Sequence, residues 1–144
     1  MPYCTNADLV SVRPNILNYG VADWSAKITE AEEYINKVLV VRWYRPAAKS
    51  LGLDPYVTEF DQTRVTTAEL KTSAVYKTLE LAYMHLMKEG PDEDGFERNM
   101  NAFAKEFQKE LDLALSVGLK YDWDAGGSAG DNLAIKSTRR LVRG

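Results

Sequence analysis

The sequence predicts an all-α fold, a small antiparallel bundle of one short and three long helices followed by an extended, flexible C-terminal arm. Apolar residues recur at intervals of three and four, which is the period of one face of a helix. Pairs of residues that cap helices stand before these stretches, and glycine or proline stands after them. No stretch that alternates apolar and polar residues, the pattern of a strand, occurs before residue 119.

The first helix is expected to be short. Thr5 is placed to accept a hydrogen bond from a free amide of the first turn, and Asp8 is placed to accept one in return from the backbone of Thr5. Arg13 precedes a proline and is therefore steered away from helical geometry. The helix should end at this residue.

The second helix is long and begins after Asp23, which is expected to cap it. Its opposite face carries charged side chains. We expect Pro46 to end the helix, because proline lacks a backbone N–H and its ring clashes with the preceding turn. The stripe that should face the core consists of Trp24, Ile28, Ala31, Ile35, Val38, Leu39, Arg42 and Trp43.

Residues 46–66 are less regular and suggest a loop with one short turn of helix. A loop of this length is unusual inside a compact domain and is often functional. The third helix follows, capped by Thr66 with Glu69, and it ends at Gly90. Its stripe consists of Leu70, Ala74, Val75, Leu79, Ala82 and Leu86, with Tyr76, Tyr83 and Met87 on a neighbouring face.

The last long helix is capped by Asp94 with Glu97. Gly118 stands where a left-handed C-terminal cap belongs. We therefore expect a helical bundle domain over residues 1–118, then a hinge and a C-terminal docking arm over residues 119–144. The apolar stripe of this helix is the clearest in the chain and consists of Phe96, Met100, Phe103, Phe107, Leu111 and Ala114.

Charge is unevenly distributed along the chain. The 144 residues have a formal net charge of −3. Residues 136–144 hold four basic side chains and no acidic one, a charge of +4, so the other residues must carry −7. A proposed function should account for this charge asymmetry between an acidic body and a basic tail.

Composition narrows the classes of protein further. No apolar run is long enough to span a bilayer, and the first residues lack the pattern of a secretory signal peptide, so we expect no membrane partner. Cys4 is the only cysteine, which excludes an internal disulfide and favours a reducing compartment.

Residues that could run a reaction are scarce. His85 is the only histidine and lacks cysteine or Glu-x-x-His partners, so zinc and di-iron sites have no ligand set. We interpret it as a partly exposed structural residue, and Cys4 as an unreactive thiol. No glycine-rich loop ends in Lys-Ser or Lys-Thr, as a phosphate-binding loop would. We therefore expect no enzymatic activity, no cofactor and no metal.

The stretch YDWDAGGSAGD, residues 121–131, partly matches a calcium-binding loop. Asp122 and Asp124 would take positions one and three, and Gly127 would take position six. Position five offers no side-chain oxygen, and position twelve, which needs a bidentate glutamate, is Leu133. We therefore interpret the stretch as a flexible hinge.

The segment after this hinge, residues 132–144, mixes isolated apolar residues with basic ones. In an extended strand most of them would share one face, and such a segment cannot bury its apolar side chains alone. It is suited to adding an edge strand to a neighbour or to folding on contact. A frayed terminus is the alternative, but the charge asymmetry favours a docking arm. The predicted partner-binding residues are Leu133, Ile135, Lys136, Arg139, Arg140, Leu141 and Arg143.

The layout resembles that of a known family. It has a capped opening, Tyr3-x-Thr5-x-x-Asp8-Leu9, a long helix from DWSAKITEAEEYINKVL, two further antiparallel helices and a C-terminal arm. In this order of elements it resembles the head–tail connector proteins of tailed bacteriophages, also called adaptor or head-completion proteins. The resemblance covers most of the chain, but the connection over residues 44–66 departs from the family pattern.

The resemblance implies a structural, non-enzymatic virion protein of the neck between head and tail, assembled in the host cytoplasm. Many copies, commonly twelve, would form a ring that docks under the portal protein and extends the DNA channel towards a tail-side connector or tail-terminator protein. DNA would pass through the lumen without specific binding, which an acidic body suits, because neutralising phosphates would hold it. The arm would reach onto the portal or onto a neighbouring copy.

A second class of function stays open. The chain could be a small nucleic-acid-binding regulatory protein that uses Arg139, Arg140 and Arg143 of its basic C-terminal tail. We rank this reading second, because the body is acidic and none of the expected helices has the basic surface of a recognition helix.

Overall fold

The structure, a computed structural model, describes residues 3–89 and 94–123. The described residues are mainly helical, as predicted, and they contain no β-structure beyond one isolated bridge. Within these residues, none of the helices is long and apolar enough to cross a membrane. The helices are α1 (Asn6–Val12), α2 (Ser25–Leu39), α3 (Arg45–Ser50), α4 (Lys71–Glu89) and α5 (Asp94–Val117), with 3-10 turns at Ile16–Asn18, Gln62–Arg64 and Thr67–Leu70 and a π-helical turn at Val40–Tyr44.

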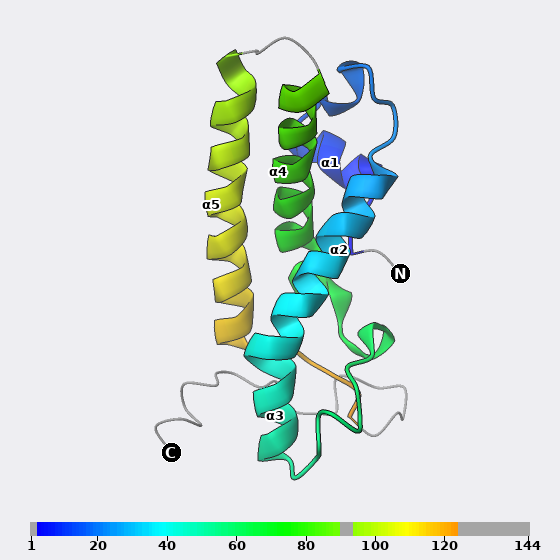
Figure 1. Cartoon of the computed structure of the whole chain (residues 1–144), viewed down its shortest axis with the longest axis vertical. Helices are drawn as coiled ribbons and strands as arrows, with labels where there is room; N and C mark the ends of the chain where they lie inside the picture. Colours follow the sequence, from blue (N-terminus) through cyan, green and yellow to red (C-terminus); the bar gives the residue numbers. More distant parts are fainter. Residues whose placement is uncertain (1–2, 90–93, 124–144) are drawn as a thin grey trace. The chain divides into compact units, whose positions relative to one another are not determined.

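The chain forms two compact units, and each is described by itself. The α1/α4 unit comprises residues 3–33 and 70–111, without 90–93, and the α3 unit comprises residues 34–69 and 112–123. Helices α2 and α5, labelled in Figure 1, contribute residues to both units. Their apolar stripes continue across the division, so the sequence pattern gives no sign of it.

Helix α1 begins with the predicted capping box. The backbone N–H of Thr5 donates to Oδ2 of Asp8 over 2.9 Å, and the N–H of Asp8 donates to Oγ1 of Thr5 over 3.4 Å. Nζ of Lys71, at the start of α4, lies 3.1 Å from the other carboxylate oxygen of Asp8. The helix ends at Arg13, whose backbone is extended, as the following proline requires.

The capping box predicts a pH dependence of stability. Desolvation acts to raise the pKa of Asp8, but hydrogen bonds from Thr5 and Lys71 outweigh it and hold the pKa below its ordinary value. A depressed pKa means that the charged carboxylate stabilises the fold above the unfolded pKa of about 3.9, and that this contribution is lost as the pH falls through the folded pKa.

We expect Asp8→Asn to destabilise the protein at neutral pH, with the difference from the wild type shrinking as the pH falls through the depressed pKa of Asp8. Urea denaturation of both proteins over this pH range measures it. Thr5→Ala, the matched control, should cost about 1 kcal/mol at neutral pH through the lost cap. A difference between Asp8→Asn and wild type that is constant with pH would contradict the role assigned to the carboxylate.

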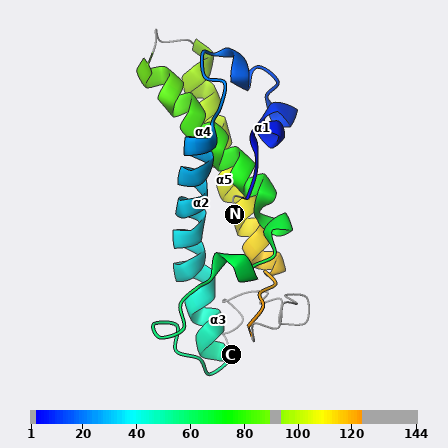
Figure 2. The same cartoon turned by 90° about the vertical axis from the view of Figure 1, so that its right-hand side faces the viewer.

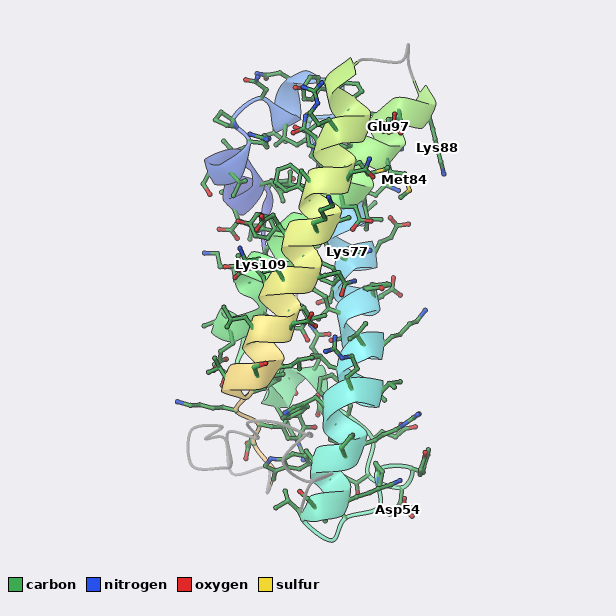
Figure 3. All side chains as sticks on the ribbon, turned by 90° about the vertical axis from the view of Figure 1, so that its left-hand side faces the viewer. Asp54, Lys77, Met84, Lys88, Glu97 and Lys109 are labelled. Carbon is green, nitrogen blue, oxygen red and sulfur yellow. The ribbon has the colours of Figure 1, made fainter. Side chains whose placement is uncertain are left out.

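Helices α4 and α5 pack against each other within the α1/α4 unit (Figure 1). The rings of Tyr83 and Phe96 lie 5.8 Å apart, and those of Tyr76 and Phe103 lie 5.8 Å apart. The residue numbers of the contacting rings fall along α4 as they rise along α5, so the two helices run antiparallel, as predicted. Lys77, labelled beside α5 in Figure 3, adds a contact further along α5, since its Nζ lies 5.2 Å from the ring centroid of Phe107.

The predicted stripes match the burial pattern at most of their positions. All six stripe positions of the third predicted helix are buried, and so are six of the eight positions of the second, but three of the six positions of the last are only half-buried. In the second helix the two departures are Val38, which is half-buried, and Arg42, which is exposed and forms an ion pair with Asp112 at 2.9 Å. Asp23 accepts a hydrogen bond from the first helical N–H, that of Ser25, over 2.9 Å, but it lies one residue before the N-cap position that was predicted for it.

The prediction that Pro46 ends the second helix is wrong. The chain passes from α2 through the π-helical turn directly into α3, and Pro46 lies in the first turn of α3. In the π turn the N–H of Arg45 bonds to the carbonyl of Val40, five residues back. This wider turn gives the proline ring room that an α-helical turn would deny it. The expected loop is shortened accordingly to the region between Ser50 and the turn at Gln62–Arg64.

The end of α5 confirms one prediction and corrects another. Gly118 has a φ of 106° and its N–H donates to the carbonyl of Ala114, so it is the left-handed cap that was predicted. The hinge, however, does not begin at residue 119. Leu119 and Tyr121 are buried, and residues 119–123 run beside residues 64–66 in the α3 unit (Figure 2).

Backbone pairing holds this short segment in place. Thr66 donates to the carbonyl of Lys120 over 3.1 Å, and Asp122 donates to the carbonyl of Arg64 over 2.9 Å. These bonds surround the antiparallel bridge between Val65 and Tyr121. Residues 119–123 are therefore part of the packed α3 unit.

Candidate partner-binding site

The residues predicted to bind a partner lie in the C-terminal arm. Leu133, Ile135, Lys136, Arg139, Arg140, Leu141 and Arg143 all fall outside the described residues, which end at Trp123. The structure instead shows how the chain is held just before the arm, and which surfaces of the same unit are available for a partner.

An aromatic cluster anchors the chain at this point. It consists of Trp43, Tyr44, Phe60, Tyr121 and Trp123, all within the α3 unit. The rings of Tyr121 and Trp123 meet edge to face at 4.7 Å, and the rings of Tyr44 and Trp123 stack at 5.5 Å with 9° between their planes. Phe60 stacks on Tyr121 at 5.7 Å. Offset and edge-to-face pairs add stabilisation beyond simple burial.

Two phenols of the cluster also hold the loop before it. The hydroxyl of Tyr44 donates to the carbonyl of Thr58, and the backbone N–H of Asp61 donates to the hydroxyl of Tyr121 over 2.9 Å. Burial raises the pKa of both tyrosines above the ordinary value, so both stay neutral at physiological pH. The loop and the segment 119–123 are thus fixed to the same cluster.

The indole N–H groups of the cluster, unlike the two tyrosine hydroxyls, lack hydrogen-bond partners in the described chain. Within the described chain, Nε1 of Trp43 and Nε1 of Trp123 are buried and have no hydrogen-bond partner. A buried N–H without a partner costs about 1–3 kcal/mol. The two tryptophans therefore stabilise the cluster through the contact area of their rings.

Exposed apolar side chains are concentrated in the same unit. Ten large apolar residues of the described chain are substantially exposed, and eight of them belong to the α3 unit. The greatest exposure is at Val57, Tyr56, Val117, Val41 and Leu113, from 78% to 56% of their surface. Exposed apolar residues gathered in one region indicate an interaction surface.

The two units also differ in charge. The described residues of the α1/α4 unit contain eleven acidic and eight basic side chains, whereas those of the α3 unit contain six of each. The acidic character of the body therefore resides in the α1/α4 unit, and the unit with the exposed apolar residues is electrically balanced. A balanced unit brings less like-charge repulsion to a contact with another copy.

The structure assigns ordinary roles to the two residues weighed for chemistry. Cys4 is buried, its Sγ lies 3.7 Å from Oγ1 of Thr78, and burial raises the pKa of its thiol, which suppresses the reactive thiolate. His85 is half-buried with its ring edge-to-face against Trp24 at 5.8 Å. Both fit the predicted structural roles.

Other possible sites in the described chain are small or incomplete. A cavity of about 160 Å³ lies between α1 and the start of α4, with Asp8 and Lys71 in its wall already paired with each other. Residues 3–89 and 94–123 contain no group of acidic, cysteine or histidine side chains able to hold a metal ion. Of the calcium loop weighed above, Asp122 is buried, while Asp124 and Leu133 lie outside the described residues.

The aromatic cluster is the feature that the sequence pattern did not reveal. Tyr121 and Trp123 alternate as residues on one face of an extended segment do, and this was the available signal. The glycines that follow directly favoured a hinge instead. Trp43 and Tyr44 are adjacent, so a regular helix would place only one of them on the stripe, and the π turn is what buries both.

No known protein family, characterised protein or solved structure matches this chain.

Proposed function

We propose that this chain is a structural virion protein, a head–tail adaptor that docks as a ring under the portal of a tailed bacteriophage and extends the DNA channel towards the tail. The observation that carries the proposal is the concentration of exposed apolar side chains in the α3 unit. A protein that works alone gains nothing from exposing them, whereas a ring subunit buries them against its neighbours.

The charge distribution supports the same function. The acidic residues in excess belong to the α1/α4 unit, and an acidic surface suits a channel that DNA must pass without being held. The basic residues of 136–144 then serve for docking onto an acidic protein partner. A nucleic-acid-binding regulator would need a basic surface on its folded part, and neither unit has an excess of basic residues.

Binding to the portal tests the proposal. The purified chain, mixed with portal rings of the same virus, should co-sediment with them in a fixed ratio, and should behave alone as a monomer or small oligomer. Duplex DNA should bind weakly at physiological salt, whereas a regulator would bind it tightly, with affinity falling steeply as salt rises. Failure to bind the portal ring, or a source genome without a portal gene, would refute the adaptor function.

A further inference from the structure

The loop between α3 and the aromatic cluster carries the most exposed apolar residues of the described chain. We call residues 51–61 the acceptor loop. Tyr56 and Val57 expose 65% and 78% of their surface, and Leu51 and Leu53 precede them on the same loop with more than a third of theirs exposed. Four exposed apolar residues within seven positions are unusual for a surface that meets only water.

The acceptor loop is held in place from several sides. Its base is fixed to the aromatic cluster through Thr58 and Asp61, as described above. Near its tip, the guanidinium of Arg45 lies 4.9 Å from the ring centroid of Tyr56, and the N–H of Tyr56 donates to Oδ1 of Asp54 over 2.9 Å. A loop fixed in this way loses little conformational freedom on binding, which favours its use as a docking surface.

The charge of the acceptor loop is complementary to that of the C-terminal arm. The loop contains three acidic residues, Asp54, Glu59 and Asp61, and no basic residue. All three are exposed, and Asp61 also lies 3.7 Å from the guanidinium of Arg64. Residues 132–144 contain four basic residues and no acidic one. Residues 132–144 also contain isolated apolar residues, as the acceptor loop does.

We infer that the acceptor loop of one copy binds residues 132–144 of a second copy of this chain. The inference rests on the proposed ring, in which each subunit must offer two different surfaces to its two neighbours. An acidic, apolar loop and a basic, apolar arm are two such surfaces. Two acceptor loops facing each other would instead bring like charges together. Leu133, Ile135 and Leu141 would pack on Tyr56 and Val57, with the arginines near Asp54 and Glu59.

Complementation between two full-length variants tests the contact. The loop variant carries Tyr56→Ser and Val57→Ser, and the arm variant carries Ile135→Ser and Leu141→Ser. Wild-type chains should self-associate weakly as concentration rises in sedimentation velocity, and added salt should weaken the association. Each variant alone should associate at least about tenfold more weakly, since two apolar side chains are lost from the contact.

An equimolar mixture of the two variants should form a one-to-one complex that grows no further, because only one intact loop and one intact arm are present. The matched control, Val12→Ser, removes an exposed apolar residue of α1, outside the α3 unit, and should leave association unchanged. No self-association of the wild type, or no complex in the mixture, would overturn the inference. Binding to the portal, measured separately, would then leave the proposed function standing.

Discussion

Replacing Trp43 with alanine should lower the free energy of unfolding by about 3–5 kcal/mol, the usual cost of removing a large buried aromatic side chain. Trp43 is 1% exposed and contacts three other aromatic rings, those of Tyr44, Tyr121 and Trp123. Domains of this size are stable by only about 5–15 kcal/mol, so the loss is a large share of the total. Urea denaturation followed by circular dichroism measures it.

Trp43→Phe is the matched control. It keeps an aromatic ring in the cluster and removes an indole N–H that has no partner within the described chain, so no hydrogen bond is lost. We expect it to be clearly more stable than Trp43→Ala and somewhat less stable than the wild type, because the smaller ring leaves part of the space empty. Equal stability of all three proteins would show that the ring is not packed as described.

The elements that the sequence predicted correctly depend on local interactions. The capping box of Thr5 and Asp8 involves four consecutive residues, and the cap at Gly118 requires only a backbone that glycine adopts without strain. The stripes follow from helical period alone, and fifteen of their twenty positions are buried. Such features can be read without knowing what the helices pack against.

The features that were missed depend on contacts between distant residues. The π turn at Val40–Tyr44 lets the helix pass Pro46, and it buries Trp43 and Tyr44 together against rings that lie some eighty positions further along. The local rule for proline considers only the clash of its ring with the preceding α-helical turn, and not a wider turn that would relieve this clash. The segment 119–123 was assigned to the hinge for the same reason, since its partners are residues 64–66 and the cluster.

The candidate site was predicted in part. Composition alone indicates the arm, because charge and apolar content can be counted without a structure. The length of the connection over residues 46–66 indicates a functional loop but not its acidic, apolar surface. That surface became apparent only when the exposure of Leu51, Leu53, Tyr56 and Val57 could be compared with the rest of the chain.

Two truncations separate the fold from the arm, and we expect opposite results. A chain ending at residue 131 should have the helix content and melting temperature of the full chain, because the apolar stripes, the cap at Gly118 and the aromatic cluster all lie before residue 124. A chain ending at Gly118 should be severely destabilised. It loses Leu119 and Tyr121, each worth about 1.5–3 kcal/mol when fully buried, along with Trp123 and the backbone pairing to residues 64–66.

The full-length variant Tyr121→Ala shows whether the loss comes from the cluster or from shortening the chain. It should lie between the two truncations in stability, because it removes one ring and its hydrogen bond to Asp61 but keeps Leu119 and Trp123. Tyr121→Phe should lose only that hydrogen bond, about 1 kcal/mol. If the chain ending at Gly118 has the same melting temperature as the chain ending at residue 131, the fold ends at residue 118 after all, and Tyr121 and Trp123 contribute nothing to its stability.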